Sequence, residues 1–152
     1  MNSTKSVWKS IQSILVVIPF EQVDYVNDWR ESIKEAGLNV HNCRILCLVP
    51  SKKERLDMRD MSYITFLAED DFNLLGKLKN EDAIKIFNAK FDGLLVVSEC
   101  SKKVLKSLSR MKFRMDIGLN TGDQNRMINL ESDELSPKHL LNFVKQTLER
   151  IS

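Results

Sequence analysis

The fold is predicted most clearly by residues 14–49, which read ILVVIPFEQVDYVNDWRESIKEAGLNVHNCRILCLV. Residues 14–20 form a continuous apolar, largely β-branched run, the pattern of a strand that is covered on both faces. Over residues 23–36 apolar side chains recur at helical spacing (Val26, Trp29 and Ile33), and Gly37 stands where a helix commonly ends. Residues 40–49 return to a strand pattern. A strand, a helix and a second strand in this order predict a right-handed crossover and a parallel pair.

The same alternation continues to the end of the chain. Further strands are predicted at residues 63–67, 91–97, 113–119 and, in short form, 127–130, and helices at 81–88 and 101–111. Ser136 and Pro137 are an N-cap and a first-turn proline that open a last helix. Residues 51–61 and 69–80 are expected to be irregular connections. These elements predict a three-layer α/β sandwich with a mostly parallel five- to six-stranded sheet, and both a Rossmann-like and a flavodoxin-like strand order are compatible with them.

Length and composition are those of one globular domain. The chain has 152 residues, of which 43% are hydrophobic, and its net charge is +2. We expect a polar N-terminal tail over residues 1–12, which either frays or lies on the body as a short helix carrying Trp8, and a single domain over residues 13–152. A near-balanced charge gives no strong nucleic-acid signal, although a local basic patch is compatible with it.

A cytoplasmic location is expected from the cysteines and from the first apolar run. Three cysteines are an odd and sparse set, which favours a reducing compartment. The run at 14–20 is far shorter than a membrane span, and Glu21 and Asp24 follow it where a signal peptide would have small residues. We therefore expect no membrane span.

The connection after the first strand argues against a bound nucleotide. Ligands of open parallel sheets bind at the carboxyl ends of the strands, and a dinucleotide or phosphate loop needs glycines there. The connection contains Phe20, Glu21 and Gln22 but no glycine. We therefore predict no cofactor, and no metal site or set of catalytic residues can be assembled from the sequence.

Several carboxylates nevertheless follow strands of the predicted sheet. Glu21 follows the first strand, Asp70 and Asp71 the third, and Glu99 the fourth. If these strands are neighbours, the carboxylates share one rim, where oxygen ligands could hold Mg²⁺ beside a phosphate. The single acid after the first strand and Asn120 after the fifth differ from a phosphate-accepting receiver domain. The alternative is that the acids are solvated loop residues.

Cys100 precedes a predicted helix, where the helix dipole lowers the pKa of a thiol. A nucleophile needs a base, and the local sequence places neither His41 nor His139 beside it. A buried thiol is the favoured interpretation. Cys43 and Cys47 lie on one face of a strand and are also interpreted as core residues.

A basic stripe on the helix at 101–111 is a candidate surface for nucleic acid or an anionic membrane. It consists of Lys102, Lys103, Lys106 and Arg110, and Lys112 and Arg114 follow it. No aromatic residue interleaves with the four cations of the helix to stack on bases. The alternative is a solvated helix face.

Three segments of the middle of the chain resemble a known family. They are FLAEDDFNLLGK at residues 66–77, FDGLL at 91–95 and KFRM at 112–115. Together they are similar to a family of small bacterial α/β proteins of unknown function. Leu78 stands where the family pattern has a proline, and the N-terminal extension is shorter and less basic. The resemblance implies the fold and a bacterial cytoplasmic setting, but no activity.

The same segment is the leading candidate for a working surface. A connection of this length at the carboxyl edge is where a ligand or partner loop lies. We hypothesise a non-enzymatic binding or assembly module that uses residues 69–79 to contact a protein partner or a second copy. The rival is a small-ligand or Mg²⁺-dependent phosphate-binding domain, and a third interpretation is that Phe72, Leu74 and Leu75 only anchor the loop on the core. The candidate site residues are Asp70, Asp71, Phe72, Asn73, Gly76, Lys77 and Glu99.

Overall fold

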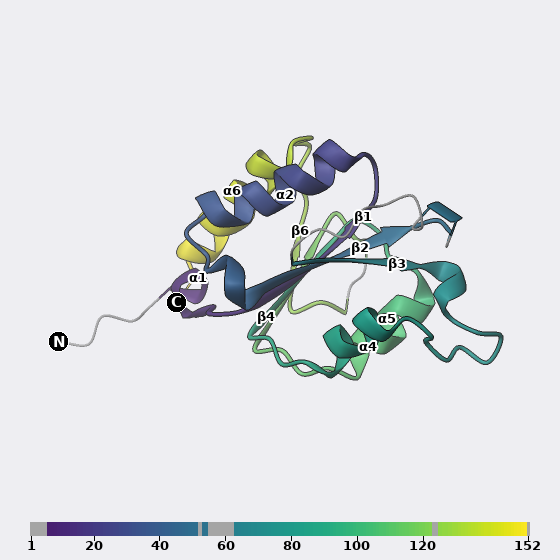
Figure 1. Ribbon diagram of the computed structural model, residues 1–152. Coiled ribbons are helices and arrows are strands. Elements are labelled where there is room, and N and C mark those ends of the chain that lie inside the picture. Colours follow the sequence, from purple (N-terminus) through teal and green to yellow (C-terminus); the bar gives the residue numbers. More distant parts are fainter. Residues whose placement is uncertain (1–5, 52, 55–62, 123–124, 152) are drawn as a thin grey trace.

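A six-stranded parallel sheet forms the centre of the protein, with the strand order β3-β2-β1-β4-β5-β6 (Figure 1). The computed structural model describes residues 6–51, 53–54, 63–122 and 125–151. The strands are β1 (Ile14–Pro19), β2 (Cys43–Val49), β3 (Ile64–Ala68), β4 (Gly93–Val97), β5 (Met115–Leu119) and β6 (Ile128–Leu130). Of the two windings compatible with the sequence, this is the strand order of the Rossmann fold. The predicted α/β sandwich is confirmed.

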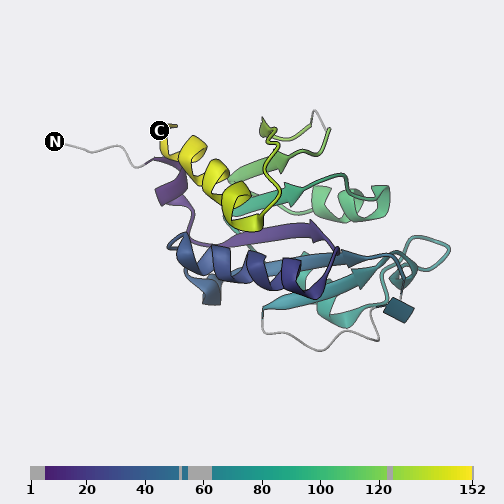
Figure 2. The same ribbon diagram turned by 90° about the horizontal axis from the view of Figure 1, so that it is seen from above.

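Helices cover both faces of the sheet. They are α1 (Val7–Ser10), α2 (Val23–Glu35), α4 (Glu81–Asn88), α5 (Lys102–Ser109) and α6 (Pro137–Glu149), with 3-10 turns at η1 (Val40–Asn42) and η2 (Glu69–Asp71). The helices α1, α2 and α6 lie on one face, and α4 and α5 lie on the other (Figures 1 and 2). Because the strands are parallel, all of them end at one edge, the carboxyl edge, and begin at the opposite one, the amino edge.

The central strand shows why its sequence is apolar throughout. Ile14, Val16 and Ile18 belong to the core under α2 and α6, whereas Leu15 and Val17 belong to the core under α4 and α5. All five side chains are at most 1% exposed. A strand with a helical layer on each side has no face left for polar residues.

The helix starts are fixed by the local signals that the sequence carries. The side chain of Asn80 accepts from the backbone N–H of Ala83 at 3.1 Å. The N-terminal residues of α5 and α6 are capped in the same way, by Ser101 and by Ser136. Each cap satisfies one backbone N–H that the helix itself cannot.

Some boundaries differ from the predicted ones. The strand expected from residue 40 begins at Cys43, because Asn39 turns the chain through η1 by accepting from the N–H of His41 at 3.0 Å. Near the N-terminus, Trp8 in α1 is buried to 6% exposure, and the N–H of Val7 donates to the carbonyl of Ile151 at 2.7 Å. The connection expected at residues 51–61 falls mostly outside the described residues.

Among the described residues, no helix has the length and apolar character that a membrane crossing requires.

Candidate functional site

A short hairpin, which we call the finger, spans residues 72–78 and projects past the carboxyl edge (Figure 1). Phe72 and Leu78 form an antiparallel bridge at its base. The N–H of Asn73 donates to the carbonyl of Lys77 at 2.8 Å, so the two arms are hydrogen-bonded up to the turn. The connection, which the sequence predicted to be irregular, thus contains a 3-10 turn and this small hairpin.

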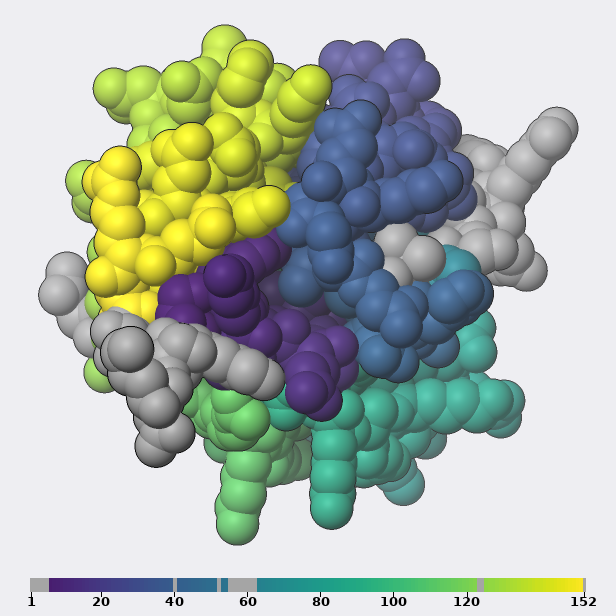
Figure 3. Space-filling view, turned by 90° about the vertical axis from the view of Figure 1, so that its left-hand side faces the viewer, coloured from purple at the N-terminus to yellow at the C-terminus, as the bar shows by residue number. Residues whose placement is uncertain are grey.

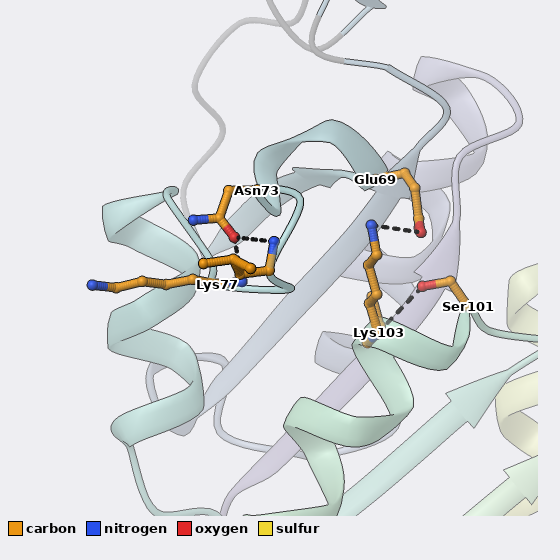
Figure 4. A network of polar contacts seen from close by, with 7 residues as sticks. Glu69, Asn73, Lys77, Ser101 and Lys103 are labelled. Atoms are coloured by element: carbon orange, nitrogen blue, oxygen red, sulfur yellow. Dashed lines mark hydrogen bonds and ion pairs between the residues drawn. The ribbon is translucent and has the colours of Figure 1, made fainter.

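The tip of the finger is held by Asn73 and Gly76. The Asn73 side-chain oxygen accepts from the backbone N–H groups of Leu75 at 2.9 Å and of Lys77 at 2.8 Å, as Figure 4 shows. Gly76 has a φ of +79°, in the left-handed region where a side chain is strained. Asn73 and Gly76, two of the predicted site residues, thus determine the backbone shape of the turn.

The base of the finger is anchored by Asp71 and Phe72. Asp71 is 2% exposed, and its Oδ2 accepts from the N–H of Ala68 at 2.7 Å and from Nδ2 of Asn80 at 3.3 Å. Phe72 is 6% exposed and packs in the core under α4 and α5. The carboxylate of Asp71 therefore points into the protein, where it accepts hydrogen bonds from a backbone N–H at the end of β3 and from the N-cap side chain of α4.

Helix α5 supports the finger from the side. Nζ of Lys103 lies 3.9 Å from Oε1 of Glu69 (Figure 4). It also lies 5.9 Å from the centre of the Phe72 ring. Both partners of the ion pair are about half exposed, and such a pair contributes little, about 0–1 kcal/mol. Lys77, by contrast, extends away from the turn (Figure 4).

Two leucines at the tip face water. Leu74 is 106% exposed and Leu75 is 93% exposed. The interpretation that all apolar residues of this loop anchor it is therefore right for Phe72 and wrong for Leu74 and Leu75. Neither leucine was among the predicted site residues. The signal for them was local: two apolar residues stand between an asparagine and a glycine that make the turn.

A crevice lies beside the finger, next to the point where the strand order reverses between β1 and β4. One cavity of about 300 Å³ has Phe20, Leu48 and Leu67 in its wall, with Glu69 and Glu99. A second cavity of about 310 Å³ shares Glu99 and is lined by Lys102 and Arg126. Their size is at the lower limit for small-molecule sites.

The structure does not gather the predicted acid rim at one point. Strand β2 lies between β1 and β3, so the third strand is not a neighbour of the first or the fourth. Neither of the two crevice cavities is lined by Asp70, Asp71 or Lys77. Within the described ranges, no three His, Cys, Asp or Glu side chains lie close enough together to hold a metal ion.

The three thiols are unsuited to nucleophilic chemistry. Burial raises the pKa of Cys100 to about 12, and the nearby Arg126 lowers it only in part. Burial likewise raises the pKa of Cys43 to about 11 and that of Cys47 to about 12. His41 lies in η1 at the amino edge and His139 in α6 on the other face of the sheet, so neither is a base for Cys100.

The basic stripe runs along α5 from one edge of the sheet to the other. Lys102 lines a cavity at the carboxyl edge, Lys103 is paired with Glu69, and Lys106 is exposed in mid-helix. Arg110 follows the helix and lines a different cavity at the amino edge. The four cations therefore do not share one site: they lie at the carboxyl edge, in mid-helix and at the amino edge.

The comparison with protein families supplies the family. A family of unknown function (DUF6913) matches residues 1–148, which is nearly the whole chain. Searches of curated proteins and of solved structures found no match. The α/β fold and the match over almost the full length agree with the resemblance seen in the three middle segments. The chain belongs to this family of unknown function, DUF6913.

Proposed function

We propose that this protein is a non-enzymatic assembly module that binds another protein through the finger. The observation that carries the proposal is the exposure of Leu74 and Leu75 on a turn with a fixed shape. Leucine side chains gain about 1.5–3 kcal/mol each on full burial. A rigid turn presents them without the entropy loss of ordering a flexible loop.

The construction of the finger supports the same function. Asn73 and Gly76 shape the tip, and Asp71 and Phe72 hold the base. A loop that only connected β3 to α4 would not need two exposed leucines at its tip. We also propose that the protein works in the bacterial cytoplasm, and its three free thiols fit a reducing compartment.

Site-specific photo-crosslinking in living cells tests the proposal. A photoreactive amino acid is placed at Leu75 and, as the control, at Leu135, which is also highly exposed at 89%. We expect a discrete crosslinked species of defined mass from position 75 and none from position 135. Equal labelling at both positions, or none at 75, would refute the proposal.

The affinity of the partner that the crosslink identifies, measured with purified variants of this protein, gives the quantitative test. Leu74→Ser with Leu75→Ser should weaken binding by about 30- to 1000-fold, since two leucines that an interface buries in part contribute roughly 2–4 kcal/mol together. Leu135→Ser should leave the affinity unchanged. Both variants should keep the thermal stability of the parent, because exposed positions alter it by less than about 0.5 kcal/mol. If the species is a second copy of this chain, the same variants are compared by sedimentation equilibrium.

A second candidate function rests on the crevice near β1 and β4. Parallel sheets bind small ligands at this position, and the two adjoining cavities carry Glu69, Glu99 and Lys102. We infer a small polar ligand, or a phosphate with Mg²⁺, for this site. Native mass spectrometry with and without Mg²⁺ tests it: a stoichiometric added mass that Glu99→Gln abolishes supports the site, and a bare mass in both conditions contradicts it.

A further inference from the structure

Cavities also lie at the opposite edge of the sheet. One of about 480 Å³ lies beside the starts of β1, β2 and β3 and is bordered by α4. A second of about 660 Å³ is formed by the connections that enter β4 and β5. The two share Ser13, Ala89, Lys90 and Phe91 and therefore adjoin each other, and together we call them the amino-edge groove.

The groove concentrates positive charge. Six cationic side chains line it, against the two carboxylates of Asp82 and Asp92. The cations are Arg44, Lys85, Lys90, Arg110, Lys112 and Arg114. The whole chain has a net charge of only +2, so the rest of the molecule is net negative. Positive charge is therefore localised at this edge, and long-range attraction of an anion is directed here.

Most of these charges are not neutralised by the protein. In the portion that the structure describes, Lys85, Lys90 and Lys112 form no ion pair. The guanidinium of Arg114 donates to the carbonyl of Ser10 at 3.1 Å, which holds it in place without cancelling its charge. Asp92 accepts from the N–H of Gln12 at 2.9 Å. The cations are thus available to an external anion.

Aromatic rings lie among the cations. Phe91 follows Lys90 directly, and Phe113 stands between Lys112 and Arg114. Phe87 also lines the groove, and all three residues are half-buried, with side chains that pack against the core under α4 and α5. In Figure 3, which looks onto this edge, the teal segment near residue 90 and the green segment near residue 112 stand side by side below the purple segment.

We propose that the amino-edge groove binds single-stranded nucleic acid. A positively charged groove that follows the phosphates, with rings on which bases stack, is the arrangement that recognises single strands without sequence preference. An anionic membrane would favour a flat basic face with protruding apolar side chains, whereas here the rings lie in a concave groove. This site is independent of the finger, which lies at the carboxyl edge.

Fluorescence anisotropy with labelled ten-nucleotide oligouridine and oligothymidine tests the proposal. The logarithm of the binding constant should fall with the logarithm of salt concentration with a slope of about −4, since each of six phosphate contacts contributes roughly −0.7. The triple variant Lys90→Ala, Arg110→Ala and Lys112→Ala should reduce the slope to about −2 and weaken binding at least tenfold. A salt-independent signal, or no binding by the parent protein, would overturn the proposal.

A matched variant separates the groove from net charge. Lys34→Ala, Lys106→Ala and Lys138→Ala remove the same number of charges at exposed positions outside the groove, and this variant should bind like the parent. An equal loss in both triple variants would show a non-specific charge effect and refute the site. Phe91→Leu should weaken binding about 5- to 100-fold and leave the salt slope unchanged, because stacking involves no counterion release. Retention on phosphatidylserine vesicles without binding of either oligonucleotide would replace nucleic acid by a membrane and overturn the proposal.

Discussion

Replacing Asp71 by alanine should destabilise the whole domain, although the residue lies at the base of a surface loop. The carboxylate is buried and accepts from the N–H of Ala68 at 2.7 Å and from Asn80 at 3.3 Å. The N–H of Ala68, a residue that is 1% exposed, would lose its partner in Asp71→Ala. A buried donor without a partner costs about 1–3 kcal/mol, and hydrogen bonds to a charged group contribute about 1.5–3 kcal/mol.

We therefore expect Asp71→Ala to lower the free energy of unfolding by about 2–4 kcal/mol. For a domain of this size each kcal/mol shifts the melting temperature by roughly 2–4 °C, so the midpoint should fall by about 4–16 °C. Urea unfolding followed by circular dichroism gives the free energy directly. Asp71→Asn, which keeps an acceptor oxygen, should recover part of the loss.

Glu99→Ala is the control, because it removes the same charge from an exposed side chain. Its free energy of unfolding should stay within about 0.5 kcal/mol of that of the parent. Hydrogen exchange adds a local measurement. The amides of Leu75 and Lys77, which donate to Asn73, should exchange faster in Asp71→Ala, since Asp71 holds the arm that carries Asn73. If Asp71→Ala were as stable as Glu99→Ala, the assignment of Asp71 as an anchor would be wrong.

Three further changes test other parts of the fold. Burial raises the pKa of the three thiols from 9.0 to about 11 or 12. The folded state therefore keeps its full stability from these groups below about pH 9 and loses it as the pH rises through the raised pKa values. The urea midpoint should fall between pH 8 and pH 10.5, and an unchanged midpoint contradicts this. Gly118→Ala would place a Cβ 2.8 Å from Cγ of Arg126 and should destabilise by about 1–3 kcal/mol through overpacking, which a thermal melt measures. Trp8→Ala should cost about 3–5 kcal/mol, since the ring is buried; a loss below about 1 kcal/mol in urea unfolding would show that α1 does not stabilise the body.

Most of the fold could be predicted because its signals are local. The apolar run of β1 and the caps Asn80, Ser101 and Ser136 each act within a few residues of their position in the chain. The strand order could not be predicted, since it depends on which strands pair with each other, and strands distant in the chain can be neighbours in the sheet. Both Rossmann and flavodoxin windings satisfy the same alternation of strands and helices.

For the candidate site, the sequence pointed to a segment but not to the directions in which its side chains face. The sequence indicated the segment at 69–79, yet it suggested that Asp71 was a surface ligand and left out Leu74 and Leu75. Asp71 turns inward because the backbone at the end of β3 needs an acceptor there, a requirement that only the folded chain reveals. The leucines turn outward because Asn73 and Gly76 close the turn beneath them.

The amino-edge groove could not be found from the sequence for a different reason. Its cations come from the start of β2, from α4 and from the connections before β4 and β5, and no single segment contains more than a few of them. The stripe on α5 was visible because it is continuous in the chain, but only Arg110 of its four residues lines the groove. A cluster of cations that come from separate segments cannot be predicted from the pattern of any one segment.

The separation of the finger and the groove allows the two proposals to be tested independently. Strand β1 has six residues and spans about 20 Å at the usual rise of a strand. That length exceeds both the range of roughly 7–10 Å over which substitutions couple and the screening length of about 8 Å at physiological salt. Leu74→Ser with Leu75→Ser should therefore leave oligonucleotide affinity unchanged, and Lys90→Ala with Lys112→Ala should leave the protein partner's affinity unchanged. If instead the partner's affinity falls when the groove is altered, the partner itself extends to the amino edge and competes there with nucleic acid, which a displacement titration would show directly.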